Sequence, residues 1–129
     1  MKRWKVFPFK ASAGLGIYNY DDEEVEELEF PVNEVPHNAD HGIWIEGDSM
    51  EPQISNGSVA WIRTQPVIEN SEIGIFYYDE ALLCKRFHRD RKNNIQLISL
   101  NDAYGPITID RLKEFRVIGK VLGTSIYDH

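Results

Sequence analysis

Residues 43–54 have the sequence IWIEGDSMEPQI, in which a β-like apolar run leads into a turn that carries a serine. Bulky apolar residues such as Ile43 and Trp44 favour a strand, whereas the glycine and aspartate close to Ser49 favour a tight turn. Ser49 therefore has two interpretations, because it can be an ordinary turn residue or a nucleophile. A nucleophilic serine needs a partner elsewhere in the chain, so the rest of the sequence must decide between them.

The chain around this segment predicts a mainly β protein. Seven stretches show alternating or short apolar runs bounded by turn residues, as strands require. They are GIWIEG (42–47), SVAWIRTQ (58–65), EIGIFYYD (72–79), ALLCKRFHRD (81–90), NIQLISL (94–100), GPITID (105–110) and FRVIGKVLG (115–123). No stretch shows the spacing of a long amphipathic helix. We therefore expect a small, strongly bent, multi-stranded β-sheet domain with at most a helical turn near the sequence SMEP.

Length and composition favour a single domain with one core. The chain has 129 residues, of which 42% are hydrophobic. Its formal net charge of −7 argues against direct binding to DNA, because a phosphate-binding surface needs clustered Lys and Arg. The single cysteine, Cys84, cannot form an intramolecular disulfide. A reducing cytoplasm therefore fits this sequence.

Residues 1–16 are predicted to form an N-terminal arm ahead of a folded domain at residues 17–129. The arm imitates a secretion signal, since it has a basic start and small residues at 11–13. Lys5, however, interrupts the roughly seven or more apolar residues that a signal requires. No segment approaches the roughly 18 apolar residues of a membrane helix either. We therefore expect neither export nor a membrane segment.

An acidic run, DDEEVEELEF, occupies residues 21–30. Such a run is usually a solvated face or a loop, and this is the structure predicted for it. The spacing of Val25, Leu28 and Phe30 would also allow its second half to turn an apolar side inward. Both possibilities place most of its carboxylates in water.

Histidine, lysine and an N-terminal amine are the usual bases that activate a serine. The four histidines are His37, His41, His88 and His129. His37 and His41 flank an expected loop, where a histidine is more often exposed than catalytic, and His129 is the last residue. None of the four has a recognisable triad setting. A serine–histidine pair is therefore the less favoured interpretation.

Lys85 lies in ALLCKRFHRD, residues 81–90, and is the stronger candidate. If this stretch is a strand, Leu83, Lys85 and Phe87 project to one face and Cys84 to the other. Burial among apolar side chains would lower the pKa of Lys85 from about 10.4 and supply a neutral amine. The alternative is a lysine that snorkels from the sheet edge and keeps its charge in water. Cys84 is expected to be a buried structural thiol.

Several segments together carry a resemblance to a known family. GDSMEP (47–52) is followed by NGSVAWI (56–62) and then by Lys85 on a later strand. IQLISLNDAYGPITID (95–110) and FRVIGKVLG (115–123) follow the lysine in turn. In this order the segments resemble the self-cleaving C-terminal domains of LexA and phage repressors. The pair Ala13 and Gly14 falls where that family has its scissile Ala-Gly bond, so the resemblance extends from residue 11 to residue 123.

The resemblance implies a Ser/Lys dyad that hydrolyses the chain's own peptide bond. Ser49 would attack the carbonyl of Ala13, and neutral Lys85 would act as the base and then as the acid to the leaving amine of Gly14. Backbone amides of Ser49 and Met50 would bind the oxyanion. The resemblance implies no cofactor and no metal. The small residues around the cleaved bond suit entry into a narrow cleft.

The resemblance also implies partners. Members of the family form homodimers. Apart from the resemblance, the apolar strand residues Phe115, Val117, Ile118 and Val121 are expected to be exposed and could form a self-associating surface. RecA bound to single-stranded DNA would act as the co-protease that releases latent cleavage after DNA damage. DNA itself would be contacted only through an N-terminal helix-turn-helix, for which the residues before position 11 are too few.

Other functions remain open. The short arm and NDAYGPITI (101–109) also fit a UmuD-like accessory protein of an error-prone polymerase. A domain with the same motif can also be a cleavage-inactive dimerisation module. A type I signal peptidase shares the serine and lysine, but its membrane anchor is absent from this sequence. Asp48 and Glu51 could bind a cation, although two carboxylates in one turn are weak support for a metal site.

Overall fold

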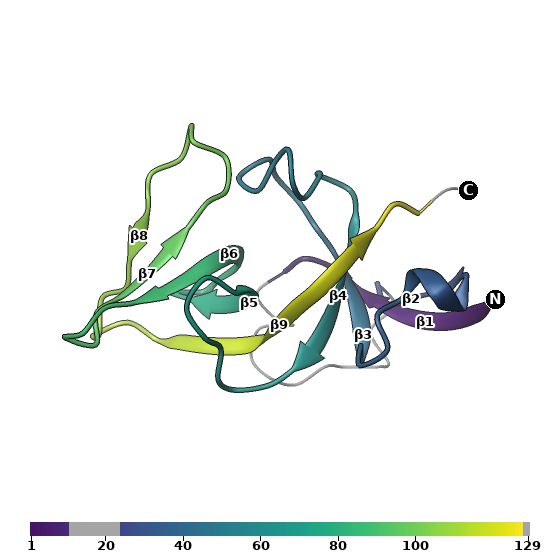
Figure 1. The fold of residues 1–129 in the computed structure, drawn as a ribbon, viewed down its shortest axis with the longest axis horizontal. Helices are drawn as coiled ribbons and strands as arrows, with labels where there is room; N and C mark the ends of the chain where they lie inside the picture. Colours follow the sequence, from purple (N-terminus) through teal and green to yellow (C-terminus); the bar gives the residue numbers. More distant parts are fainter. Residues whose placement is uncertain (11–23, 128–129) are drawn as a thin grey trace.

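The computed structural model describes residues 1–10 and 24–127. In this part of the chain nine strands form one mixed sheet in the order β2-β1-β3-β4-β9-β5-β6-β7-β8 (Figure 1). The strands are β1 (Lys2–Phe7), β2 (Glu26–Phe30), β3 (His41–Trp44), β4 (Val59–Thr64), β5 (Ile73–Tyr78), β6 (Ala81–Arg89), β7 (Ile95–Ile98), β8 (Ile107–Thr108) and β9 (Phe115–Ser125). A 3-10 turn, η2 (Val32–Glu34), follows β2. The predicted mainly β fold is confirmed.

Each of the seven predicted strands is present, from β3 to β9. Two further strands, β1 and β2, were not predicted. They pair antiparallel with each other, and β1 also pairs with β3 in the parallel direction. The predicted boundary between the N-terminal arm and the folded domain, at residues 16 and 17, lies outside the described residues. The first part of the predicted arm nevertheless belongs to the sheet.

Strand β9 joins the two halves of the sheet. Its first residues pair with β5, its last residues pair with β4, and Gly119 and Lys120 pair with both. Figure 1 shows β9 as the long yellow strand that crosses the molecule between these partners. The register shifts between Trp61 and Ile62 and again between Ile75 and Phe76, and such bulges increase the local twist and bend of a sheet. The sheet is therefore bent at its centre.

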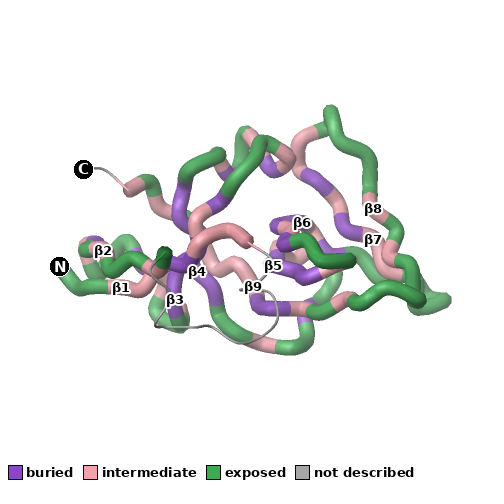
Figure 2. The backbone as a smooth tube through the Cα atoms, turned by 180° about the vertical axis from the view of Figure 1, so that it is seen from behind, coloured by how far each residue is buried: buried purple, intermediate pink, exposed green. Residues whose placement is uncertain are grey.

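Three groups of buried side chains form the core, and the central one spans both halves of the sheet. It contains Phe7 from β1, Ile43 from β3, Ile75 from β5, and Leu82 and Cys84 from β6. A second group lies around Trp61, and a third lies around Phe76. Figure 2 shows buried segments along the strands of both halves. The central group holds together the two regions that contribute the site described below.

Two expectations about individual residues are wrong. His41 was expected to flank a loop and be exposed, but it begins β3 and is 3% exposed, beside the ring of Phe7. Ile118 was expected on a self-associating surface, but it is 5% exposed and packs in the central core. Phe115 and Val117 are partly buried against the third core group. The alternation of β9 thus turns Ile118 inward, where a partner subunit cannot reach it.

Candidate active site

Ser49 lies in the connection between β3 and β4, in a turn that is fixed at both ends. Gly47 has a φ of 91°, which favours glycine, and its N–H donates to Asn56 Oδ1 at 2.9 Å. The N–H of Ile54 donates to the carbonyl of Met50 at 2.9 Å, which closes one hydrogen-bonded turn of the expected kind near SMEP. Met50 is 2% exposed and packs in the central core. Ser49 is half-buried beside it.

Lys85 lies in the middle of β6, and its face of the strand follows the predicted alternation. Leu83 and Phe87 pack in the third core group, whereas Cys84 packs in the central group on the other side. The Lys85 residue is 6% exposed, so its amine does not snorkel into water from the sheet edge. Cys84 is a free, buried thiol.

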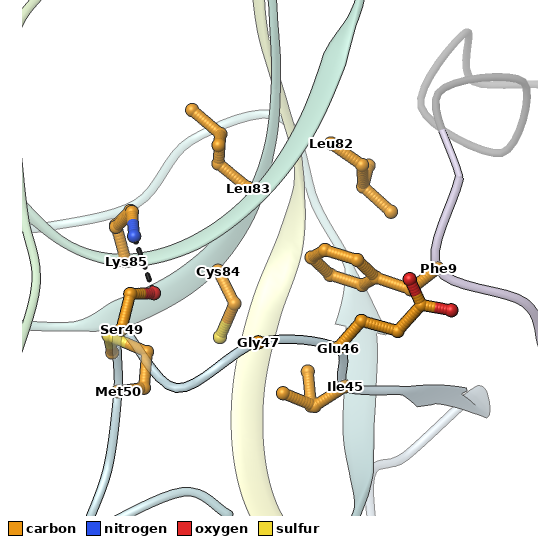
Figure 3. Close-up of a pocket in the computed structure, with 10 residues that line it drawn as sticks. All are labelled: Phe9, Ile45, Glu46, Gly47, Ser49, Met50, Leu82, Leu83, Cys84 and Lys85. Carbon is orange, nitrogen blue, oxygen red and sulfur yellow. Dashed lines mark hydrogen bonds between the residues drawn. The ribbon is translucent and has the colours of Figure 1, made fainter. Parts of the chain in front are cut away.

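The two side chains meet, although β4, β9 and β5 lie between β3 and β6 in the sheet. Lys85 Nζ donates to Ser49 Oγ at 2.6 Å, and Figure 3 shows the two groups pointing toward each other. Burial lowers the pKa of Lys85. A Cys84 thiolate would oppose this effect, but burial raises the pKa of Cys84 to about 12, so the thiol is uncharged at neutral pH. The site therefore favours a neutral amine within hydrogen-bond distance of a serine hydroxyl.

A small pocket opens beside these two groups. Its walls include Ile45 and Gly47 from the connection after β3, Leu82 and Leu83 from β6, and Phe9 from the segment after β1 (Figure 3). Its volume is about 90 Å³. Most of its lining side chains are apolar, although the exposed Glu46 also contributes, and Lys85 itself is buried, so its amine is poorly solvated. The pocket is suited to hold a small apolar group against the serine.

The predicted oxyanion donors are the backbone amides of Ser49 and Met50. Within residues 1–10 and 24–127, neither N–H donates to another protein atom. Both amides follow the Gly47 turn and lie next to the serine in the chain. Two adjacent amides beside a nucleophile are the arrangement that stabilises a tetrahedral oxyanion.

The predicted scissile pair, Ala13 and Gly14, lies outside the described residues. The described chain before it ends at Lys10, and Phe9 already lines the pocket beside Ser49 and Lys85. Strand β1 therefore directs the chain toward the site before residue 11. This placement is consistent with a cleavage segment that begins close to the nucleophile.

The histidines supply no alternative base among the described residues. His41 is buried, and burial lowers its pKa to about 4. His37 and His88 are exposed, and none of these three lines the pocket with Ser49. His129 lies outside the described residues. Among the described residues, Lys85 is thus the candidate base that lies beside Ser49.

The two carboxylates considered as cation ligands, Asp48 and Glu51, lie in the turn that carries Ser49. Asp48 accepts a hydrogen bond from the hydroxyl of Tyr104, and Glu51 follows in the same turn. No group of three or more His, Cys, Asp and Glu side chains that could hold an ion occurs in the part of the chain that the structure describes. Among the same residues, no helix is long and apolar enough to cross a membrane.

Sequence reasoning missed Asn101 and Tyr104, which contact the Ser49 turn from the connection between β7 and β8. The N–H of Asn101 donates to the carbonyl of Ser49 at 2.9 Å, and its side-chain amide donates to the carbonyl of Asp48 at 2.9 Å. The signal available in the sequence was a polar cluster, NDAYG, after a strand. That pattern is ordinary turn chemistry, so it did not distinguish a contact with the site.

Comparison with known proteins agrees with the resemblance identified in the sequence. Residues 5–122 match the family model described as Peptidase S24-like. The chain is 37% identical to the LexA repressor of Carboxydothermus hydrogenoformans, over 76% of this chain and 48% of that protein. It is 33% identical to the LexA repressor of Thermosipho melanesiensis, over 88% of this chain and 57% of that protein. The chain thus spans about half the length of the curated relatives it matches.

Proposed function

Because the chain belongs to the Peptidase S24-like family, we propose that it is the self-cleaving peptidase and dimerisation domain of a LexA-like repressor. Its substrate is its own bond between Ala13 and Gly14. The observation that carries this proposal is the 2.6 Å contact between Lys85 Nζ and Ser49 Oγ at a small pocket. A buried lysine beside a serine hydroxyl is the pairing that Ser/Lys hydrolysis requires.

The reaction begins with transfer of the Ser49 hydroxyl proton to the neutral amine of Lys85. The serine oxygen attacks the carbonyl carbon of Ala13, and the amides of Ser49 and Met50 stabilise the oxyanion. Lys85 then gives its proton to the nitrogen of Gly14, the peptide bond breaks, and an ester links Ala13 to Ser49. Water activated by Lys85 hydrolyses this ester and restores the serine.

The proposal for latency and regulation is supported by the family resemblance rather than by the geometry of the site. The relatives are LexA repressors, and we propose that a RecA filament on single-stranded DNA stabilises the reactive arrangement after DNA damage. A partner that binds the docked form of the cleavage segment raises the rate in proportion to the population of that form. We also propose a cytoplasmic homodimer, with DNA bound through a further domain.

Incubation of the pure chain at alkaline pH tests the proposal. We expect slow conversion to two fragments, with a new N-terminus at Gly14 that mass spectrometry identifies. Ser49→Ala and Lys85→Ala should each lower the rate of self-cleavage at least about 100-fold, because nucleophile and base act as a unit. Circular dichroism should show that both variants remain folded.

The matched control is Ser55→Ala, since Ser55 lies in the same connection but not in the pocket. It should cleave at the wild-type rate. A wild-type chain that stays whole at every pH would instead favour a dimerisation module without peptidase activity. Cleavage of Ser49→Ala at the wild-type rate would remove Ser49 from the mechanism.

A further inference from the structure

The connection between β7 and β8 holds three consecutive residues of the serine turn. Besides the two Asn101 contacts to Asp48 and Ser49, the N–H of Leu100 donates to Met50 Sδ at 3.4 Å. Tyr104 adds a hydrogen bond from its hydroxyl to the Asp48 carboxylate. Figure 1 shows this connection beside the one between β3 and β4. We refer to the contacts of Asn101 and Tyr104 as the latch.

The latch adds hydrogen bonds between the serine turn and the β6–β7 part of the sheet, which also meet in the central core. Gly47 and Met50 fix the turn to its own connection and to the central core. The latch residues instead follow β7, which pairs directly with β6, the strand of Lys85. Lys85 Nζ also lies 6.0 Å from the centroid of the Tyr104 ring. Tyr104 therefore contacts the serine turn through its hydroxyl while its ring lies near the lysine amine.

We propose that Tyr104 and Asn101 are positioning residues, which hold the Ser49 turn against the Lys85 strand so that the hydroxyl stays within reach of the amine. The inference rests on the proposed self-cleavage and goes beyond it, because neither residue touches the reacting atoms. Displacement of a reacting group by about 1 Å can cost about 100-fold in rate. Hydrogen bonds from supporting residues restrict such displacements.

The internal structure of the latch supports a fixed geometry. The N–H of Ala103 donates to Asn101 Oδ1 at 3.0 Å, and the N–H of Tyr104 donates to the carbonyl of Asn101 at 3.1 Å. Asn101 thus organises its own loop with one side-chain oxygen while its side-chain nitrogen binds Asp48. A preformed loop loses little conformational entropy when it holds another segment.

A double-mutant cycle on one hydrogen bond tests the proposal in the full chain. Tyr104→Phe removes the hydroxyl but keeps the ring, and Asp48→Ala removes the acceptor. Each should slow self-cleavage roughly tenfold, and the double variant should be no slower than either one, because both changes delete the same contact. Asp48→Asn keeps an acceptor oxygen and should recover most of the rate lost in Asp48→Ala.

Tyr78→Phe is the control, since the Tyr78 hydroxyl accepts from the Asp110 N–H away from the serine turn. It should cleave at the wild-type rate. Tyr104 is 47% exposed, so its hydroxyl should contribute little to the melting temperature. If the loss of rate is matched by a fall of more than about 4 °C in melting temperature, the hydroxyl serves stability and the inference is wrong.

Two other results also overturn the inference. Wild-type rates in both Tyr104→Phe and Asp48→Ala would show that the contact does not position the serine. Losses that multiply in the double variant would show that the residues act separately. These outcomes differ from failure of the proposed function, in which the wild-type chain itself would not cleave and the latch would have no reaction to support.

Discussion

Lys85 is an ionisable residue in a site that disfavours its charge. It is buried between apolar side chains, and burial lowers its pKa in the folded chain. In the unfolded chain the same amine has its ordinary pKa of 10.5. Below about pH 10.5 the unfolded amine is protonated. Folding must then either bury its charge or release its proton, and either one costs free energy. The residue proposed as the base is thus expected to lower stability.

Replacement of this lysine by methionine should raise the free energy of unfolding. At pH 7 we expect Lys85→Met to be more stable by about 0.5–2 kcal/mol, as for other active-site residues whose function conflicts with stability. Between its lowered folded-state pKa and 10.5 the unfolded wild-type chain binds more protons, so wild-type stability rises with pH there. The advantage of the variant should shrink accordingly and disappear above that window.

Urea denaturation at several pH values, in the Ser49→Ala background to prevent cleavage, measures this difference. Lys92→Met is the control, because Lys92 is exposed in the turn after β6. It should change the free energy of unfolding by less than about 0.5 kcal/mol. A Lys85→Met variant that is less stable than wild type at pH 7 would contradict the expectation.

The same pKa shift gives a pH dependence for self-cleavage. Only the neutral amine of Lys85 can accept the serine proton, so the rate should rise with pH and level off above the folded-state pKa. Because burial lowers that pKa, the plateau should begin below pH 10.5. Fragment yield against time in a series of buffers gives the profile. A rate that is flat from neutral pH to pH 10 would argue against lysine as the base.

At the level of the elements, strands were predictable where their pattern is local. The alternating segments from β3 to β9 show this, since each carries its own apolar face between turn residues. Strands β1 and β2 have no such local pattern. Lys5 donates to Glu27 at 3.0 Å and Arg3 to Glu29 at 3.4 Å across the two strands. Considered alone, β1 resembles a basic arm and β2 resembles an acidic loop, because their charges are balanced only when the two strands pair.

The candidate site likewise has residues that the sequence suggested and residues that it did not. The sequence nominated Ser49, in a turn after Gly47, and Lys85, on an apolar strand face, but the family resemblance was needed to favour them over an ordinary turn serine and an exposed lysine. The contribution of Asn101 and Tyr104 depends on which loop lies beside the serine turn, and that follows from the pairing of β6 with β7. No single segment contains this information. The cleavage pair at Ala13 and Gly14 stays a prediction from the resemblance.

Gly119 is the position in β9 where a side chain is least tolerated. A Cβ there would lie 2.6 Å from the Arg63 carbonyl oxygen and 2.7 Å from Ile62 Cγ2. We expect Gly119→Ala to lower the free energy of unfolding by about 1–3 kcal/mol, because backbone must move to make room. Gly123→Ala is the control, since its nearest neighbour would be Pro36 Cγ at 3.4 Å.

Thermal and urea denaturation of the two glycine variants provide the comparison. Gly123→Ala should fall within about 1 kcal/mol of wild type, because the added methyl makes ordinary contacts. Equal stability of the two variants would show that β9 can shift away from β4 without cost. In that case the close approach at Gly119 would not be needed to hold the two halves together.

For the whole molecule, the proposed nucleophile and the proposed cleaved bond belong to one chain. Phe9 lines the pocket of Ser49 and Lys85, so the segment that leads to Ala13 starts at the site. An intramolecular reaction needs no encounter between molecules, and its rate constant should not change over about a 100-fold dilution. A rate that rises with protein concentration would instead indicate cleavage of one chain by another.

A mixing experiment gives the corresponding control. A tagged Ser49→Ala chain cannot cut itself, and it should remain whole when it is incubated with untagged wild type. Gel analysis of the tag distinguishes the two routes directly. Cleavage of the tagged chain would show that the pocket accepts the segment of another molecule, and a homodimer would be the natural place for that exchange.

The second half of β9 supports the strand that follows the serine connection. Its last residues, from Gly119 to Ser125, are the hydrogen-bonded neighbours of β4, and the connection that carries the serine runs into β4. Loss of this pairing would therefore leave β4 without its β9 neighbour and weaken the link between the serine side and the lysine side without touching either residue.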